Sequence, residues 1–416
     1  MKSWIESANR EETDFPLNNL PYGVFSARGG AAHCGVAIGD CILDLTALEA
    51  DNNLGLFDRR VFGAPAWNDF MALGPEAWKR LRIWLIGALG EDSPVQAMAE
   101  TYLVDRLSAT MHLPFRVAEF TDFYAGKHHA TNVGTMFRGP GNALPPNWLH
   151  IPIGYNGRAS SVVVSDTDFH RPWGQIKKPD APMPEFAPTR RFDFELEIGV
   201  IVGQPSEGPV SVVRADEMIF GYVLLNDWSA RDIQVWEYQP LGPFQAKASA
   251  TTISPWIVTR AALEPFRVPT PAREVPLLPY LEEPGPMLHD IDLEVAFATA
   301  SRAETIIART NMRELYYSPA QLLAHHTTSG CPMRVGDLLG TGTISGAGKE
   351  NRGSLLELSW GGREPLELEG GIQRSFIEDG DTITLRGMAC GAGYRIGFGE
   401  CRGTVLPALE YPDAGG

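Results

Sequence analysis

Short apolar segments rich in β-branched residues recur along most of this chain, and glycines and prolines separate them. The clearest begin at residues 160, 192, 252, 290, 355 and 381 and read SSVVVS, FDFELEIGVIVG, TISPWIV, DIDLEVAFATA, LLELSW and DTITLRG. Segments of this kind, bounded by turn-forming residues, are typical of β-strands. The 43 glycines and 32 prolines are dispersed among them rather than massed in low-complexity runs. The chain is therefore expected to be mainly β, in an α+β arrangement with short helices.

The N-terminal part has a different pattern, so we predict one domain over residues 1–116 and a β-rich domain over residues 117–416. Short apolar bursts flank a Gly39-Asp40 turn, which is the pattern of small antiparallel strands. Between residues 64 and 89, apolar side chains recur at intervals of three and four, with a break at Gly74-Pro75. This spacing predicts two helices that cover a compact barrel.

The charge balance excludes several classes of partner. With 51 acidic and 35 basic residues the net charge is -16, which repels phosphate backbones and anionic lipids, so neither nucleic acid nor a membrane is an expected partner. No apolar run reaches the ~20 residues that span a bilayer, and the N-terminal MKSWIESANREETDF is too polar for a signal peptide. The five cysteines include no CxxC pair and are expected to be buried thiols in a reducing, cytoplasmic compartment.

Several common catalytic motifs are absent or incomplete. GAGYRIG, which begins at Gly391, has its third glycine one position too late for a dinucleotide fingerprint. GTISGAGKE, which begins at Gly342, has Thr343 and Glu350 where a phosphate loop needs glycine and Ser/Thr. The sequence contains no HExxH and no GxSxG, so zinc hydrolysis and serine acyl transfer lack their parts.

Two acidic residues interrupt an otherwise apolar strand segment. Glu195 and Glu197 stand two positions apart, so both carboxylates are expected on one face of the strand. Adjacent like charges cost free energy unless water or a cation lies between them. The alternative interpretation is an acidic face that is simply solvated.

A second polar group lies in NDWSARDIQVWEY. Asp227, Arg231, Gln234 and Tyr238 are spaced by four, three and four residues, which is one face of a helix, and Asp227 falls at the turn from the preceding strand. Side chains at such turns point out of the edge of a sheet, where active sites are common. A salt-bridged surface face is the alternative.

A third group lies in TDFYAGKHHATNVGTMFR. It contains Asp122, Tyr124, His128, His129 and Arg138. Histidine is the side chain best suited to proton transfer near neutral pH, although a hydrogen-bonded structural histidine is the alternative. The other histidine pair, at residues 325 and 326, has no acidic neighbours in sequence and is expected to be structural.

The acidic residues of the three segments suit a metal ion. If Asp122, Glu195, Glu197 and Asp227 converge, they offer only carboxylate oxygens, the ligands preferred by Mg²⁺, Ca²⁺ and Mn²⁺. Zinc more often takes histidine or cysteine. Because the segments are far apart in the chain, spacing alone leaves open whether they converge.

Taken together, these segments resemble the fumarylacetoacetase family, nearly end to end. The matching motifs are DFPLNNLPYGVFS, ATMHLP, TDFY, HATNVG, ALPPNWLHIPIGYNGRASSVVVS, ELE, LLNDWSARDIQVWEYQPLGPF, GTISG, LLELSW and GYRIGFGEC. Related acylpyruvate hydrolases and decarboxylases share the acidic site but generally lack the N-terminal domain and the WEYQPLGPF run. One departure is AKASATT where the family often reads GKSFGTT, so that alanines occupy positions 246, 248 and 250 beside Lys247.

The resemblance implies a fold, an activity and partners. The fold would be an N-terminal SH3-like barrel with helices, followed by a mixed β-sandwich roll. The activity would be metal-dependent hydrolysis of a carbon–carbon bond in 4-fumarylacetoacetate, a diketo dicarboxylate, to fumarate and acetoacetate, the last step of tyrosine and phenylalanine catabolism. The cofactor would be Ca²⁺ or Mg²⁺. The family forms homodimers, and the proline-dense stretches 172–188 and 265–286 are candidates for subunit contacts.

The resemblance also implies a role for individual residues. His129 matches the general base and Glu357 the carboxylate that orients it, while Arg231, Gln234 and Lys247 match the group that faces the developing oxyanion. The implied substrate-binding residues are Tyr124, Arg138, Tyr155, Gln234, Tyr238 and Thr343. The implied metal ligands are Asp122, Glu195, Glu197 and Asp227, with Lys247 and Thr251 beside the metal.

Two other interpretations stay open at this point. One is a related acylpyruvate hydrolase, or a 2-oxo acid decarboxylase or isomerase, which would be recognised by different products such as pyruvate or CO₂. The other is a metal-dependent binding protein with a decayed site. That protein would be expected to lack His129 or Glu357, and the sequence contains both.

Overall fold

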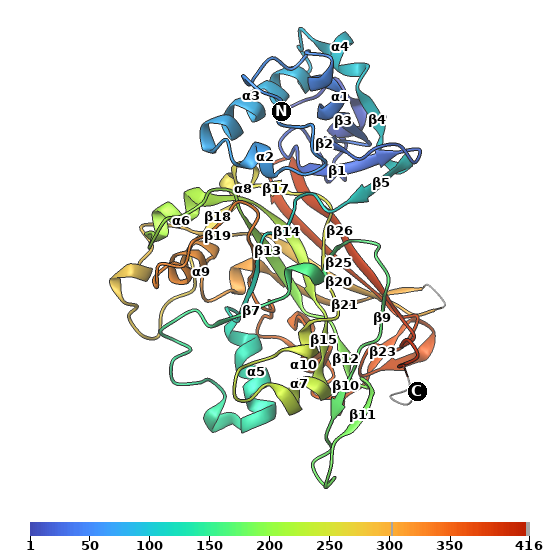
Figure 1. The fold of residues 1–416 in the computed structure, drawn as a ribbon, viewed down its shortest axis with the longest axis vertical. Helices are drawn as coiled ribbons and strands as arrows, with labels where there is room; N and C mark the ends of the chain where they lie inside the picture. The colour runs from blue at the N-terminus through green and yellow to red at the C-terminus, as the bar shows by residue number, and fades with distance from the viewer. Residues whose placement is uncertain (301–302, 413–416) are drawn as a thin grey trace.

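The computed structural model describes residues 1–300 and 303–412. Figure 1 shows a smaller N-terminal part, drawn in blue, lying against one end of a larger β-rich body. The N-terminus lies in the smaller part.

A five-stranded antiparallel sheet and the helices beside it form the N-terminal part. The strands are β1 (Tyr22–Ala27), β2 (His33–Ile38), β3 (Cys41–Asp44), β4 (Leu103–Asp105) and β5 (Ala109–His112), and the helices are α1 (Leu45–Ala50), α2 (Asn68–Met71), α3 (Pro75–Leu89) and α4 (Gln96–Glu100). The strand order is β4-β3-β2-β1-β5. The predicted break between two helices is confirmed at Gly74, whose φ of 88° separates α2 from Pro75, the first residue of α3.

An eight-stranded mixed sheet forms the centre of the larger body. Its strands are β6 (Phe120–Phe123), β7 (Gly154–Asn156), β8 (Val162–Val164), β13 (Leu196–Val202), β14 (Ile219–Asp227), β16 (Thr251–Ile253), β17 (Val258–Thr259) and β22 (Leu338–Gly340). The order is β7-β6-β22-β13-β14-β16-β8, with β17 also paired to β14. The pairs β22–β6 and β16–β8 are parallel. Every residue of β13 and β14 is buried, as continuous apolar runs predict for strands covered on both faces.

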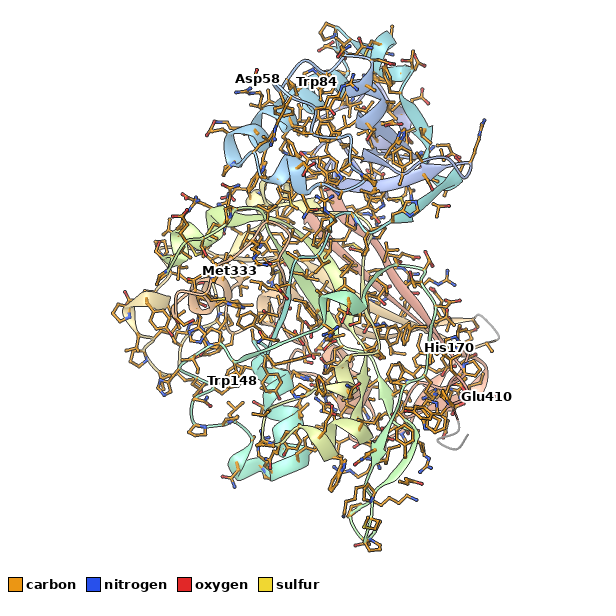
Figure 2. All side chains as sticks on the ribbon, in the orientation of Figure 1. Asp58, Trp84, Trp148, His170, Met333 and Glu410 are labelled. Carbon is orange, nitrogen blue, oxygen red and sulfur yellow. The ribbon has the colours of Figure 1, made fainter. Side chains whose placement is uncertain are left out.

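A five-stranded sheet packs against this central sheet. It contains β9 (Phe169–His170), β20 (Asp292–Ala298), β21 (Glu304–Asn311), β25 (Thr382–Gly391) and β26 (Tyr394–Leu406), in the order β21-β20-β25-β26-β9. Gly387 marks the contact, because a Cβ there would lie 2.8 Å from Leu224 of β14. Trp148 and Met333, labelled in Figure 2, belong to the hydrophobic core of the larger body.

Two-stranded ribbons and short helices complete the larger body. The ribbons are β10 (Trp173–Ile176) with β11 (Glu185–Pro188), β12 (Phe192–Asp193) with β15 (Ser229–Ala230), β18 (Arg267–Val268) with β19 (Leu288–His289), and β23 (Leu366–Leu368) with β24 (Ile372–Arg374). The helices are α5 (Lys127–Arg138), α6 (Val212–Met218), α7 (Arg231–Glu237), α8 (Arg260–Leu263), α9 (Pro319–His326) and α10 (Leu355–Leu358). The proline-dense stretch 172–188 forms the ribbon that projects at the bottom of Figure 1.

The expected strand at residue 355 is wrong, because this segment is the helix α10. The Ser354 hydroxyl accepts a hydrogen bond from the backbone N–H of Glu357 at 3.3 Å, and the Asp193 carboxylate accepts from Leu355 and Leu356. These side-chain acceptors satisfy N–H groups that a single helical turn leaves free. One of the acceptors is distant in sequence, so the segment's own pattern could not reveal it.

Two other expected strands are interrupted. The strand at residue 192 divides into β12 and β13, because β12 pairs with β15 whereas β13 pairs with β14 and β22. Pro255 lies between β16 and β17, where it cannot supply a ladder donor. The expected helical face from Asp227 to Tyr238 is shorter than predicted, because Asp227 is the last residue of β14 and the helix begins at Arg231.

The N-terminal part shares a hydrophobic core with the central sheet. Phe220 of β14 is 2% exposed and contacts three aromatic rings of the N-terminal part, with ring centroids 5.7 Å from Tyr22, 6.0 Å from Phe70 and 5.0 Å from Trp78. Aromatic pairs at such distances contribute beyond their buried area. The contact therefore fixes the N-terminal part on the sheet that carries the site described below.

We expect Phe220→Ala to lower the free energy of unfolding by about 3–5 kcal/mol, the range for removing a buried aromatic ring. Leu107→Ala is the control, because Leu107 is 82% exposed, and should change stability by no more than about 0.5 kcal/mol. Denaturant titration measures both. Equal, small losses for the two variants would show that the aromatic contact does not hold the two parts together.

The predicted fold class is confirmed at the level of a mainly β, α+β protein. The boundary between residues 116 and 117 stays a prediction. All five cysteines are free. Cys34 and Cys401 are buried and Cys41 and Cys331 are partly buried, but Cys390, near the end of β25, is exposed, so the expected burial is wrong for Cys390. Within the described ranges, no helix is long and apolar enough to cross a membrane.

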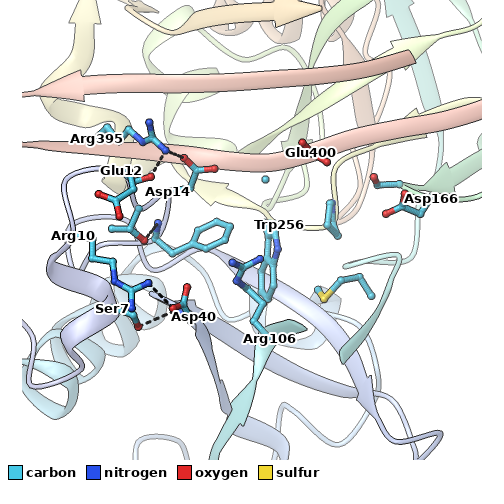
Figure 3. A pocket seen from close by; sticks show the side chains of 16 residues that line it. Ser7, Arg10, Glu12, Asp14, Asp40, Arg106, Asp166, Trp256, Arg395 and Glu400 are labelled. Atoms are coloured by element: carbon cyan, nitrogen blue, oxygen red, sulfur yellow. Dashed lines mark hydrogen bonds and ion pairs between the residues drawn. The ribbon is translucent and has the colours of Figure 1, made fainter. Parts of the chain in front are cut away.

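A polar pocket of about 410 Å³ lies where the N-terminal part meets the larger body (Figure 3). Two ion pairs line it, Arg395 with Asp14 at 3.1 Å and Arg10 with Asp40 at 2.8 Å. Arg106 stacks on the ring of Phe15, with 5.1 Å between the guanidinium carbon and the ring centroid. This pocket shares no lining residue with the cavity of the larger body that is described in the next subsection, so the two are separate.

Candidate active site

Four buried carboxylates meet at one end of the central sheet. Asp122 lies on β6, Glu197 on β13 and Asp227 at the end of β14, while Glu195 lies in the gap between β12 and β13. One oxygen from each of the four lies within 4.8 Å of the others. The convergence that sequence spacing left open is therefore present in the structure.

Gly340 makes this approach possible. It is the last residue of β22, which lies between β6 and β13, and it pairs with Asp122 on one side and Gly199 on the other. A Cβ at this position would lie 2.4 Å from Asp122 Oδ1 and 2.8 Å from Glu197 Oε2. Any other residue would push the two carboxylates apart.

Lys247 binds two of the four carboxylates. Its Nζ donates to Glu195 Oε2 and to Asp227 Oδ2, both at 2.6 Å. Burial alone would lower the pKa of Lys247, but the charges of Asp227 and Glu195 more than offset it and raise the pKa. Tyr155 donates to Asp227 Oδ2 at 3.1 Å, and Thr251 lies 3.4 Å from Asp227 Oδ1. Both therefore hold a predicted ligand in place.

Asp122 and Glu197 lack such compensation. Asp122 Oδ1 and Glu197 Oε1 are buried and have no hydrogen-bond partner among the residues that the structure describes. Burial raises the pKa of Asp122 well above its usual value, with repulsion from Asp227 adding to it. Burial likewise raises the pKa of Glu197, together with the charge of Asp122. Unpartnered oxygens and mutual repulsion are what a bound cation would relieve, so the donor set fits a hard divalent ion.

His129 and Glu357 form a buried pair beside the carboxylates. His129 Nδ1 lies 2.6 Å from Glu357 Oε2, and His129 Nε2 lies 3.8 Å from Glu195 Oε1. Burial would raise the pKa of Glu357, but the neighbouring imidazole and the hydrogen bonds to the carboxylate lower it. The carboxylate therefore accepts the Nδ1–H of the ring, and Nε2 is left to accept a proton.

Three polar side chains fix Glu357. Asn132 donates to Oε1 at 2.8 Å, while Ser345 and Ser354 donate to Oε2 at 3.0 and 2.7 Å. Sequence reasoning missed all three. Asn132 lies one helical turn after His129 in HATNVG, so its spacing on α5 is the signal that could have found it.

Arg231 and Gln234 are neighbours on the first turn of α7. Arg231 Nη1 donates to Gln234 Oε1 at 3.0 Å, and Arg231 Nη2 lies 2.8 Å from Glu195 Oε1. Burial by itself would lower the pKa of Arg231, but Asp193 and Glu195 raise it. Because the oxygen of Gln234 is occupied, its amide nitrogen is the group left to donate into the cavity.

A cavity of about 400 Å³ opens above these groups. All of the predicted substrate-binding residues line it, namely Tyr124, Arg138, Tyr155, Gln234, Tyr238 and Thr343. His129, Asp122, Glu195, Arg231 and Lys247 line it as well. Thr343 Oγ1 is buried there, and no residue in the described part of the chain forms a hydrogen bond with it. Arg138 is exposed and donates to the carbonyls of Asn142 and Ala143, at 3.1 and 2.7 Å. The predicted site residues that do not line the cavity are Glu197, Asp227, Thr251 and Glu357.

The other predicted histidines lie outside this cavity. His128 is partly exposed, with Nε2 3.5 Å from Glu314 Oε2. His326 is hydrogen-bonded to Thr121 and His325 to Tyr280, both at 2.9 Å. The structural role expected for His325 and His326 agrees with these contacts.

Comparison with known proteins identifies the family. The description "Fumarylacetoacetate (FAA) hydrolase C-terminal" matches residues 119–406, and "Fumarylacetoacetase N-terminal" matches residues 18–114. The chain belongs to the fumarylacetoacetase family. A fumarylacetoacetase from Homo sapiens is 47% identical, covering 96% of this chain and 98% of its own length. One from Dictyostelium discoideum is 48% identical, covering 98% of each chain.

Solved structures show the same fold at low sequence identity. A fumarylacetoacetate hydrolase from Exiguobacterium antarcticum has a TM-score of 0.53 and 15% identity, covering 93% of this chain and 99% of that one. A putative HpcE protein from Mycobacterium smegmatis has a TM-score of 0.52 and 18% identity, again covering 93% and 99%. The resemblance to the fumarylacetoacetase family that the sequence motifs indicated is confirmed.

Proposed function

We propose that this enzyme hydrolyses the carbon–carbon bond of fumarylacetoacetate to give fumarate and acetoacetate. It would thus be a hydrolase that acts on carbon–carbon bonds in a diketone. The observation that carries the proposal is the buried His129–Glu357 pair, 2.6 Å apart, beside four carboxylates in one cavity. Near full-length identity of 47% to a named fumarylacetoacetase supports the substrate.

In this proposal His129 activates water. Glu357 holds the ring through Nδ1, so Nε2 accepts a proton from a water molecule in the cavity. Asn132, Ser345 and Ser354 fix Glu357 and so the ring's orientation. The arrangement is that of an acid-oriented imidazole, as other hydrolases use on unrelated folds.

Arg231, Gln234 and Lys247 would face the alkoxide that forms when water attacks the carbonyl. Lys247 commits two of its three protons to Glu195 and Asp227, which leaves one for the substrate. Gln234 offers its amide nitrogen because Arg231 occupies its oxygen. Fixed donors of this kind contribute about 2.7–4 kcal/mol each where they have been removed in other enzymes.

Asp122, Glu195, Glu197 and Asp227 would hold a divalent cation, Ca²⁺ or Mg²⁺. When bound, the cation would act as a Lewis acid and template for the enolate oxygen of the leaving group. Around it, Tyr124, Tyr155, Tyr238 and Thr343 offer hydroxyl groups, and Arg138 lies on the rim. A guanidinium suits the carboxylate of a diketo dicarboxylate.

Further features complete this proposal. We infer that the N-terminal sheet closes as an SH3-like barrel and that the enzyme is a cytoplasmic homodimer with no nucleic-acid or membrane partner. Its reaction would be the last step of tyrosine and phenylalanine catabolism. The family relationship supports these inferences.

A spectrophotometric assay of fumarylacetoacetate tests the proposed activity. We expect the absorbance of the substrate to disappear, with fumarate and acetoacetate as products. A chelator should stop the reaction, because four carboxylates without a cation repel one another, and added Ca²⁺ or Mg²⁺ should restore it. Pyruvate or CO₂ formed instead from an acylpyruvate or oxaloacetate would identify a related 2-oxo acid enzyme.

A further inference from the structure

A third acidic residue continues the alternation of Glu195 and Glu197. In FDFELE, Asp193 stands two positions before Glu195, and in the structure it lies on β12 with no exposed surface. It does not belong to the group of four carboxylates. Its contacts point instead toward the groups proposed to perform the reaction.

Both oxygens of Asp193 are fully engaged. Oδ1 accepts hydrogen bonds from the backbone N–H of Leu355 at 2.7 Å and of Phe194 at 2.8 Å. Oδ2 accepts from the backbone N–H of Leu356 at 3.0 Å and from Arg231 Nε at 2.8 Å. A buried carboxylate is stable only when it is paired and hydrogen-bonded in this way.

One end of this arrangement determines where Glu357 lies. Leu355 and Leu356 are the first two residues of α10, and Glu357 is the third. Because α10 has a single turn, its position depends on the acceptors at its start, which are Ser354 and Asp193. A shift of this turn would move Glu357 and, through it, the His129 ring.

The other end determines where Arg231 lies. With Nε held by Asp193, Nη1 reaches Gln234 and Nη2 reaches Glu195. A guanidinium has a rigid planar fork, so fixing Nε fixes the direction of the other two nitrogens.

We propose that Asp193 is a positioning residue that fixes the His129–Glu357 pair and the Arg231 guanidinium at their positions relative to each other. The proposal rests on the roles proposed above for Glu357 and Arg231. Asp193 itself does not line the cavity and acts only through these neighbours. Since a misplacement of about 1 Å can cost on the order of 100-fold in rate, a residue that sets both positions is expected to influence turnover strongly.

Asp193→Asn tests the proposal. The amide keeps one acceptor oxygen but places an NH₂ group against Arg231 Nε or the N–H groups of α10. We expect kcat to fall by about 10- to 100-fold, the range for residues that orient catalytic groups. KM, and the affinity for Ca²⁺ measured by calorimetry, should change by less than about 3-fold, because Asp193 itself neither lines the cavity nor belongs to the four carboxylates.

Asp381→Asn is the matched control. Asp381 is also fully buried, accepts from Arg374 Nε at 2.8 Å and from the backbone N–H of Glu378 at 2.8 Å, and lies outside the cavity. Both variants should unfold at a lower temperature than the unmodified enzyme. Only Asp193→Asn should lower kcat, when kcat is calculated from the concentration of folded enzyme that calorimetric Ca²⁺ binding gives. Unchanged kcat in folded Asp193→Asn would overturn the proposal.

A double-mutant cycle separates positioning from general destabilisation. In the Glu357→Gln background, Asp193→Asn should lower kcat much less than it does alone, because the residue it positions is already impaired. Equal losses in both backgrounds would overturn the proposal. If Asp193→Asn does not fold, Asp193→Ser, which leaves room for a bridging water, takes its place with the same expected result. Full activity of Glu357→Gln alone would instead overturn the proposed role of Glu357.

Discussion

His129→Ala is expected to lower kcat by about 100- to 10,000-fold, the contribution of a positioned general base. Among the residues the structure describes, the substitution removes the only imidazole that lines the cavity, whose Nδ1 is held by the buried Glu357 carboxylate so that Nε2 can accept a proton. Binding of Ca²⁺ and of fumarate should remain near that of the unmodified enzyme, because His129 is not one of the four converging carboxylates. Steady-state kinetics and calorimetry measure the two effects.

The neighbouring histidine supplies the control. His128 lies on the same helix, is partly exposed and does not line the cavity, so His128→Ala should turn over substrate at a near-normal rate. Near-normal turnover in His129→Ala would remove the general-base role. A loss of Ca²⁺ binding in the same variant would show that the histidine supports the cation site instead.

Glu197→Gln is expected to weaken Ca²⁺ and Mg²⁺ binding by at least about 10- to 100-fold, the effect of losing residues that merely orient ligands. The new side-chain amide would still offer an oxygen to the N–H of Gly342, which donates to Glu197 Oε2 at 2.9 Å in the unmodified chain. The second oxygen, Oε1, which has no hydrogen-bond partner within residues 1–300 and 303–412, would become an NH₂ group and could not bind a cation. Isothermal titration calorimetry measures the change.

Thermal unfolding gives a second readout for the same variant. Without cation, Glu197→Gln should be at least as stable as the unmodified chain, because burial and nearby carboxylates raise the pKa of Glu197 and make its charged form costly. With cation, the unmodified chain should gain stability and the variant should not. Glu294→Gln, on β20 and outside the site, is the control. An unchanged calorimetric titration of Glu197→Gln would show that the cation binds elsewhere.

Most of the segments that local pattern predicted as strands are strands in the structure, and local pattern also gave the residue types of the site. The alternation at Glu195 and Glu197 predicted carboxylates on one side of a strand, and both carboxylates belong to the group of four that converge in the structure. Local pattern failed for α10, where a leucine-rich segment was expected to be a strand. Its helical turn depends on Asp193, more than 160 residues earlier, whose oxygens accept the N–H groups of Leu355 and Leu356.

The sequence by itself therefore determined the mainly β class, the family and the identity of the chemical groups, because strand alternation and motif spacing are properties of neighbouring residues. Only the tertiary structure decided that Asp122, Glu195, Glu197 and Asp227 share one site. That convergence depends on the order in which β6, β22, β13 and β14 pair and on the missing side chain of Gly340 between them. Distances between residues remote in the chain arise from packing, which no local spacing contains.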